Sequence, residues 1–162
     1  MITLVSGVVL TPVWWLISPD HLLRTALTVT LGHLISGLVF SCDLDVYSTE
    51  YQRWGPLRII WWPYQHMIFH RSVLSHGLVI GPLLRLAYFG VVVYALAWLI
   101  LGPLGHGDLV VRFRTDFEAL MRDNSGQSWA FLWGFITGGA AHTIPDWLQT
   151  SAKRARREWK RL

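Results

Sequence analysis

The chain has little charge and almost no cysteine. Charged residues make up 15% of its 162 residues, against roughly 25% in an ordinary soluble protein, and 52% are hydrophobic. This deficit in charge favours a membrane protein. The one cysteine, Cys42, excludes an internal disulfide and leaves the redox compartment open. Internal repeats and low-complexity tracts are absent, and a chain of this length is expected to form one domain over residues 1–162.

A basic segment at the N-terminus is also missing. The first apolar stretch runs directly into Trp14 and Trp15, so we expect no cleavable signal peptide. The net charge of +4 comes largely from the basic tail 151–162, which does not indicate a nucleic-acid-binding surface. Ten tryptophans and five tyrosines are many for this length, and such side chains concentrate where lipid meets water. Membrane lipids are therefore the expected partners.

Apolar stretches recur along the chain, and crossing the hydrocarbon of a bilayer takes about 20 such residues in a helix. The candidate spans are Ile2–Ser18, Leu22–Phe40, Leu78–Leu101 and Trp129–Ala141. Pro12 is expected to kink or split the first span, and the glycine-rich fourth span has to pack closely against a neighbour. We predict an all-α polytopic membrane bundle of about four transmembrane helices.

Interfacial segments are expected between and after these spans. The segment that precedes the third span interleaves aromatic and basic residues, among them Trp54, Arg58, Trp61 and Trp62, which is typical of an element lying along lipid headgroups. Residues 110–121 alternate charge and apolarity like an amphipathic helix. The basic tail is expected to contact anionic lipid.

Lysines and arginines gather on one side of a four-span topology, the side that both termini share with residues 43–71. The positive-inside rule places this side in the cytoplasm. Carboxylate and imidazole side chains also fall at these cytoplasmic ends of the spans, namely Asp43, Asp45, His70, His76, His142 and Asp146.

Three short motifs carry these side chains. They are S-C-D-L-D-V-Y (41–47), H-R-S-V-L-S-H-G (70–77) and H-T-I-P-D-W (142–147). Imidazole and carboxylate are ligands that Zn, Fe and Mn accept, and gathering them is costly unless a cation lies between them. We therefore predict a divalent metal site at a membrane face, with Zn as the preferred ion and Mn or Fe as alternatives.

The first two motifs also have plain structural interpretations. Asp43 and Asp45 are also consistent with residues that merely end the second span in water. His76, at the start of the third span, is equally consistent with a partly exposed interfacial histidine, in a helix capped by Ser72 or Ser75.

The third motif and the ionisable residues inside the spans leave similar choices. His142 and Asp146 share a face if the helix continues; if Pro145 ends it, Asp146 caps the tail instead. His33, about 10 Å inside the second span, is either functional or a neutral histidine hydrogen-bonded to a neighbouring helix. Arg85 is either paired inside the bundle or extended toward the headgroups.

The order of the three motifs resembles an uncharacterised family of metal-binding membrane proteins seen mainly in cyanobacteria. It is also similar to a shortened YdjM-type membrane-bound metal-dependent hydrolase, with its P-D-x-D, H-R-x-x-T-H-S and H-x-x-x-D motifs. The match runs from Leu31 to Trp147. The resemblance implies an inner or thylakoid membrane location, and it implies as metal ligands Asp45, His76, His142 and Asp146, with Asp43 and His70 close by.

The chain departs from this family pattern at two places. Cys42 stands where the family usually has proline. The polar stretch with a His-Asp pair that usually precedes the first span is missing, so we expect either a truncated start or a lost ligand, and with it lost catalysis.

Two functions follow as hypotheses. In the first, the protein is a metal-dependent hydrolase of a lipid-like ester or phosphoester, in which the metal activates water and Asp43 or His70 is the general base. In the second, it is a non-catalytic accessory subunit of a larger membrane complex, holding a structural metal, a pigment or haem. Metal transport is disfavoured, because a transport pathway needs polar residues through the full depth of the membrane. Only His33 and Arg85 meet this requirement in the predicted spans.

Overall fold

The computed structural model describes residues 2–18, 22–68 and 72–159. Within these ranges, no description is given for the side chains of residues 2, 73, 74, 146, 149, 150, 153–155, 157 and 158. The described elements are all helices: α1 (Ile2–Ile17), α2 (Leu23–Leu38), η1 (Cys42–Asp45), α3 (Thr49–Arg53), η2 (Gly55–Trp61), α4 (Trp62–Met67), α5 (Val73–His76), α6 (Ile80–Leu101), α7 (Gly107–Asp123) and α8 (Ser125–Trp159). The all-α prediction is confirmed for the described part of the chain.

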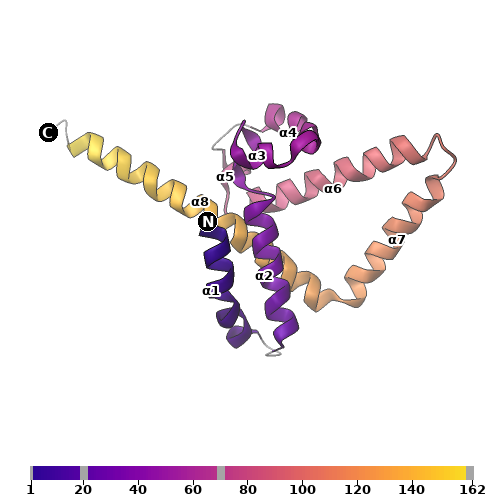
Figure 1. Cartoon of the computed structure of the whole chain (residues 1–162), viewed down its shortest axis with the longest axis horizontal. Helices are drawn as coiled ribbons and strands as arrows, with labels where there is room; N and C mark the ends of the chain where they lie inside the picture. Colours follow the sequence, from indigo (N-terminus) through magenta and orange to yellow (C-terminus); the bar gives the residue numbers. More distant parts are fainter. Residues whose placement is uncertain (1, 19–21, 69–71, 160–162) are drawn as a thin grey trace.

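Helices α1, α2 and α8 pack side by side and form the body of the molecule (Figure 1). Helix α1 runs antiparallel to α2, since the hydroxyls of Thr11 and Thr30 lie 2.9 Å apart while Thr3, near the start of α1, lies against Gly37 near the end of α2. Helix α8 runs parallel to α2, and the side chain of Gln127 bonds that of Thr25 near the start of both. The start of α1, the end of α2 and the middle of α8 therefore meet at one end of the body.

Glycines allow α2 and α8 to touch backbone to backbone. A Cβ atom added to Gly134 would lie 1.9 Å from the carbonyl oxygen of Val29, and one added to Gly138 would lie 2.1 Å from that of His33. No side chain fits at such distances, so the contact depends on glycine itself. The expected close packing of the glycine-rich segment is confirmed, and small residues of this kind are typical of helix contacts in membranes.

Two prolines lie inside helices without ending them. Helix α1 continues through Pro12, and α8 continues through Pro145 to Trp159, so the expected split of the first span does not occur. Proline removes one backbone hydrogen bond, but both helices continue beyond it. His142 and Asp146 consequently lie one turn apart on a continuous helix.

An aromatic core fills the space where η2 and α4 cover the end of α2 (Figure 1). Trp61 is fully buried there, and its ring meets that of Phe40 edge-on with centroids 5.7 Å apart. Trp62, the next residue, is 58% exposed. The expected interfacial segment is thus two-sided, because its helical turns direct neighbouring tryptophans to opposite faces. Only its outer face remains available to headgroups.

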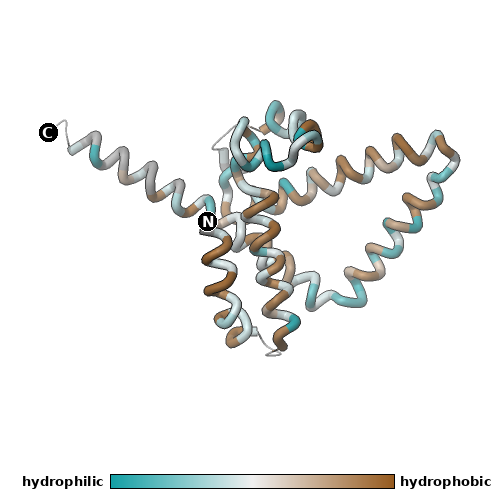
Figure 2. Tube along the Cα trace, in the orientation of Figure 1, coloured by the Kyte–Doolittle hydropathy of each residue, from teal (hydrophilic) through white to brown (hydrophobic). Residues whose placement is uncertain are grey.

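Helices α6 and α7 form a hairpin that extends away from the body (Figure 1). Within the described residues, two segments are long and apolar enough to cross a membrane, Leu23–Asp45 and Ile80–Leu101. Figure 2 shows that apolar residues are concentrated on α1, α2 and α6. Helix α1, with 16 residues, reaches about 24 Å, less than the roughly 30 Å of hydrocarbon. The predicted four-span arrangement is therefore not established by length and apolarity.

Candidate metal centre

The first part of the site is η1, the tight 3₁₀ turn that follows α2. Its Cys42 and Asp45 are buried, whereas the side chain of Asp43 is 33% exposed. The amide of Gln65 donates to the carbonyls of Leu44 and Val46 at 3.0 and 3.1 Å. These two bonds fix the backbone of η1 against α4. The side chains of η1 therefore project from a fixed backbone.

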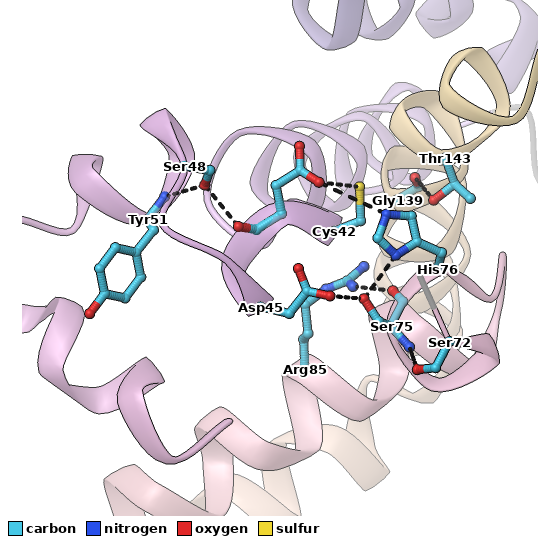
Figure 3. A network of polar contacts seen from close by, with 11 residues as sticks. Cys42, Asp45, Ser48, Tyr51, Ser72, Ser75, His76, Arg85, Gly139 and Thr143 are labelled. Carbon is cyan, nitrogen blue, oxygen red and sulfur yellow. Dashed lines mark hydrogen bonds and ion pairs between the residues drawn. The ribbon is translucent and has the colours of Figure 1, made fainter. Parts of the chain in front are cut away.

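The second part is α5, a four-residue helix that ends at His76. Ser72 caps it, because the Ser72 hydroxyl accepts a hydrogen bond from the Ser75 amide at 3.2 Å. The sequence predicts Ser72 or Ser75 as the cap of the third span; Ser72 instead caps the separate helix α5, and α6 begins at Ile80 without a side-chain cap. His76 does not open the third span, however, since α6 begins only at Ile80. The break between α5 and α6 turns the His76 ring toward η1 (Figure 3).

Cys42, Asp43 and His76 form a cluster whose ligand atoms all lie within 4.8 Å of one another. The Cys42 thiol donates to Oδ1 of Asp43 at 3.7 Å, and Nε2 of His76 lies 3.9 Å from the same oxygen. Ligand atoms around a tetrahedral Zn²⁺ lie about 3.3–3.6 Å apart for bonds of about 2.0–2.3 Å. Small side-chain rotations would therefore bring these three atoms to bonding distance of one ion.

Asp45 lies beside this cluster and is connected to His76 by hydrogen bonds through Ser75. Its Oδ2 accepts a hydrogen bond from the Ser75 hydroxyl, and this hydroxyl lies 2.8 Å from Nδ1 of His76 (Figure 3). Asp45 thus reaches His76 through Ser75. Its position as a direct ligand, expected from the sequence, stays a prediction.

Arg85 supports the same arrangement from α6. Its guanidinium is fully buried and donates to the Ser75 carbonyl oxygen at 2.8 Å, which agrees with the alternative that Arg85 is paired inside the bundle. The positive charge also acts on Asp45 and on the Tyr64 hydroxyl. Burial raises the pKa of Tyr64, and the charge of Arg85 opposes that rise without cancelling it. Tyr64 is therefore a neutral phenol at the edge of the site.

The remaining candidates are placed differently. His142 is half-buried on α8 and interacts electrostatically with His33 and Glu50; it is not among the three clustered ligands. The side chain of Asp146 and the whole of His70 lie outside the described residues.

His33 is hydrogen-bonded to neighbouring helices, which is the second of the two interpretations that the sequence left open. It is buried, and its ring bonds the hydroxyls of Ser6 on α1 at 2.9 Å and Thr137 on α8 at 3.1 Å. This histidine therefore joins three helices and is not one of the three clustered ligands.

Cys42 and Ser75 are the residues of the centre that sequence reasoning did not assign to it. A thiol directly before D-L-D was a usable signal, since thiolate is among the strongest zinc ligands in proteins. Ser75 carried no comparable signal, because a serine beside a histidine is common and its partner Asp45 is distant in the chain.

The fold and the cluster together have the features of an all-helical metal-binding protein. Residues 1–156 match the family model described as "Uncharacterized metal-binding protein (DUF2227)", and the chain belongs to this family. No curated protein and no solved structure matches the chain significantly. The family description agrees with a metal site and names neither the ion nor a reaction.

Proposed function

We propose that the protein is a membrane-bound metal-binding protein that holds one divalent ion between Cys42, Asp43 and His76. The observation that carries this proposal is the convergence of their thiol, carboxylate and imidazole atoms within 4.8 Å, from two separate elements. This donor set suits Zn²⁺, and the thiolate makes Mn²⁺ a poorer fit, because Mn²⁺ prefers oxygen ligands.

Further ligands expected from the sequence are part of this proposal. Helix α8 packs against η1 and carries His142 and Asp146 one turn apart, so a fourth ligand from α8 is a reasonable expectation. Asp45 acts on the site at least through Ser75. His70, as a general base, remains a prediction from the motif alone.

The reaction that this site would support best is hydrolysis of a lipid-like ester or phosphoester. With Cys42, Asp43 and His76 as the protein ligands, a coordination position is open, as in catalytic zinc sites, whereas a fourth ligand from α8 would fill it and make the ion structural. At an open position the bound ion would supply Lewis-acid activation of the carbonyl or phosphoryl group. The cluster is reachable, since the Asp43 side chain is 33% exposed. Apolar side chains exposed on η2 and α4 would contact the acyl part, namely Leu57, Ile59, Trp62 and Met67.

Metal analysis of the detergent-purified protein tests the proposal. We expect about one equivalent of zinc per chain, and loss of that zinc in His76→Ala and Asp43→Asn. His66→Ala is the matched control, because His66 is an exposed histidine whose ring bonds its own helix at the Trp62 carbonyl. Full zinc content in His76→Ala would refute the assignment. Zinc-dependent cleavage of chromogenic acyl and phosphate esters tests the hydrolase step separately.

A second candidate is the non-catalytic subunit of a larger membrane complex. It is favoured by α6, in which Gly81, Pro82 and Arg85 alone are buried, and by an apolar groove of about 620 Å³ between α6 and α7. Purification under mild detergent distinguishes the two functions. A stoichiometric membrane partner would support the subunit, whereas a monodisperse monomer with hydrolase activity would count against it.

A further inference from the structure

The Ser75 hydroxyl lies between a carboxylate and an imidazole. It donates to Oδ2 of Asp45, and its oxygen lies 2.8 Å from Nδ1 of His76. Ser75 is fully buried, and Asp45 and His76 are 5% and 6% exposed. Figure 3 shows the three side chains in a row that leads from η1 to the inner edge of the His76 ring.

The number of protons available fixes the direction of both hydrogen bonds. A serine hydroxyl has one proton, and a carboxylate can only accept. Because Ser75 gives its proton to Asp45, its oxygen has to accept from His76, and Nδ1 of the ring is then the protonated nitrogen. In a neutral imidazole the other nitrogen carries a lone pair. That nitrogen is Nε2, which faces Oδ1 of Asp43 at 3.9 Å.

We propose that Ser75 is a positioning residue for the metal centre: held by Asp45, it fixes His76 in the tautomer that presents Nε2 to the ion. This inference rests on the proposed metal site and assigns a role within it. It gives Asp45 a task as the anchor of Ser75, and it explains why two aspartates two positions apart are both directed to one site. Outer partners of this kind orient metal-binding histidines and raise their basicity.

The row is anchored from three elements. The Ser72 cap holds the Ser75 amide, and the buried guanidinium of Arg85 donates to the Ser75 carbonyl at 2.8 Å. Arg85 also places a positive charge near Asp45, which stabilises the carboxylate in a buried position. Ser75 is therefore constrained at its amide, its carbonyl and its hydroxyl, and a hydroxyl held in this way can select one tautomer.

The first test measures zinc affinity of the full-length protein in detergent by competition with a chromophoric chelator. Ser75→Ala removes the relay and is expected to weaken binding about 10–100-fold, the usual effect of losing an outer partner. Ser75→Thr keeps a hydroxyl and is expected to retain most of the affinity. Thr30→Val is the control, because it removes a buried hydroxyl in the contact between α1 and α2. Unchanged affinity in Ser75→Ala would overturn the proposal.

The second test reads the tautomer directly and needs no metal. The metal-free protein is labelled with ¹⁵N-histidine and studied by NMR in mildly alkaline buffer, in which an ordinary histidine is neutral. The His76 signals are assigned by their loss in His76→Gln. We expect a protonated Nδ1 and an unprotonated Nε2, and a shift toward the other tautomer in Ser75→Ala.

The two failures are distinguishable. A protonated Nε2 on His76 in the wild-type protein would overturn the role of Ser75 even if zinc binds. Absence of zinc from a protein with the expected tautomer would refute the metal site, while the arrangement of Ser75 and His76 would stand.

Discussion

Nε2 of His76 lies 3.9 Å from Oδ1 of Asp43, and this distance joins the end of α5 to the turn that follows α2. The same oxygen accepts a hydrogen bond from the Cys42 thiol at 3.7 Å. One carboxylate oxygen therefore meets both a sulfur and a nitrogen ligand. Replacing individual side chains around this oxygen separates a metal site from an ordinary polar contact.

Cys42→Ala is expected to weaken zinc binding by more than about 100-fold, because a direct ligand contributes more than an outer partner. In the cobalt-substituted protein the near-ultraviolet absorption of the sulfur–cobalt bond should disappear. Ser41→Ala is the control, since Ser41 is the adjacent buried residue and is not part of the cluster. A cobalt spectrum that is the same in Cys42→Ala and wild type would exclude the thiol as a ligand.

Gly138→Ala is expected to lower the free energy of unfolding by about 1–3 kcal/mol, because its new methyl group would overpack the contact with α2. The added Cβ would lie 2.1 Å from the carbonyl oxygen of His33. Gly126→Ala, in the same helix, meets nothing within 4 Å and should be neutral or slightly stabilising. Thermal unfolding in detergent measures both, and equal midpoints would argue against the close α2–α8 contact.

Arg85→Met is expected to destabilise the protein by about 3 kcal/mol, because a buried carboxylate loses its nearby cation and the Ser75 carbonyl loses its donor. Arg85→Lys should lie between wild type and Arg85→Met, since it keeps the charge without the planar guanidinium. Arg24→Met, at an exposed arginine, should change stability by less than about 0.5 kcal/mol. Resistance to proteolysis measures the stability of each variant. Equal resistance of Arg85→Met and Arg24→Met would disprove the prediction.

Trp98→Phe tests whether α6 lies in lipid. Trp98 is 41% exposed on α6, whereas Trp61 is fully buried in the aromatic core. In vesicles with brominated acyl chains, the quenched part of the tryptophan fluorescence should fall in Trp98→Phe and stay unchanged in Trp61→Phe. Equal quenching in the two variants would mean that lipid does not reach α6 at this position.

Several features of the fold could be predicted because they depend on local composition. The all-α class follows from the long apolar stretches, and the close contact of the fourth apolar segment follows from its glycines at positions 134 and 138. A serine just before a helix predicts a cap, but the helix that Ser72 caps is α5 and not the third span. The choice for His33 between a function and a hydrogen bond could not be made from sequence, because it depends on which hydroxyls α1 and α8 place beside it.

Other features depend on tertiary contacts, so local sequence patterns could not predict them. The continuity of α8 through Pro145 was not predictable, because proline disfavours a continuing helix without excluding it. The burial of Trp61 next to an exposed Trp62 depends on how η2 and α4 turn over the end of α2. Cys42 is a potential thiolate ligand next to D-L-D in the sequence, but its contact with His76 depends on the break between α5 and α6.

X-ray absorption at the zinc edge of the purified, zinc-loaded protein tests the central claim most directly. A site built by Cys42, Asp43 and His76 predicts one sulfur at about 2.3 Å together with nitrogen and oxygen ligands at about 2.0–2.2 Å, and it predicts loss of the sulfur signal in Cys42→Ala. A spectrum with nitrogen and oxygen ligands alone in the wild-type protein would contradict it.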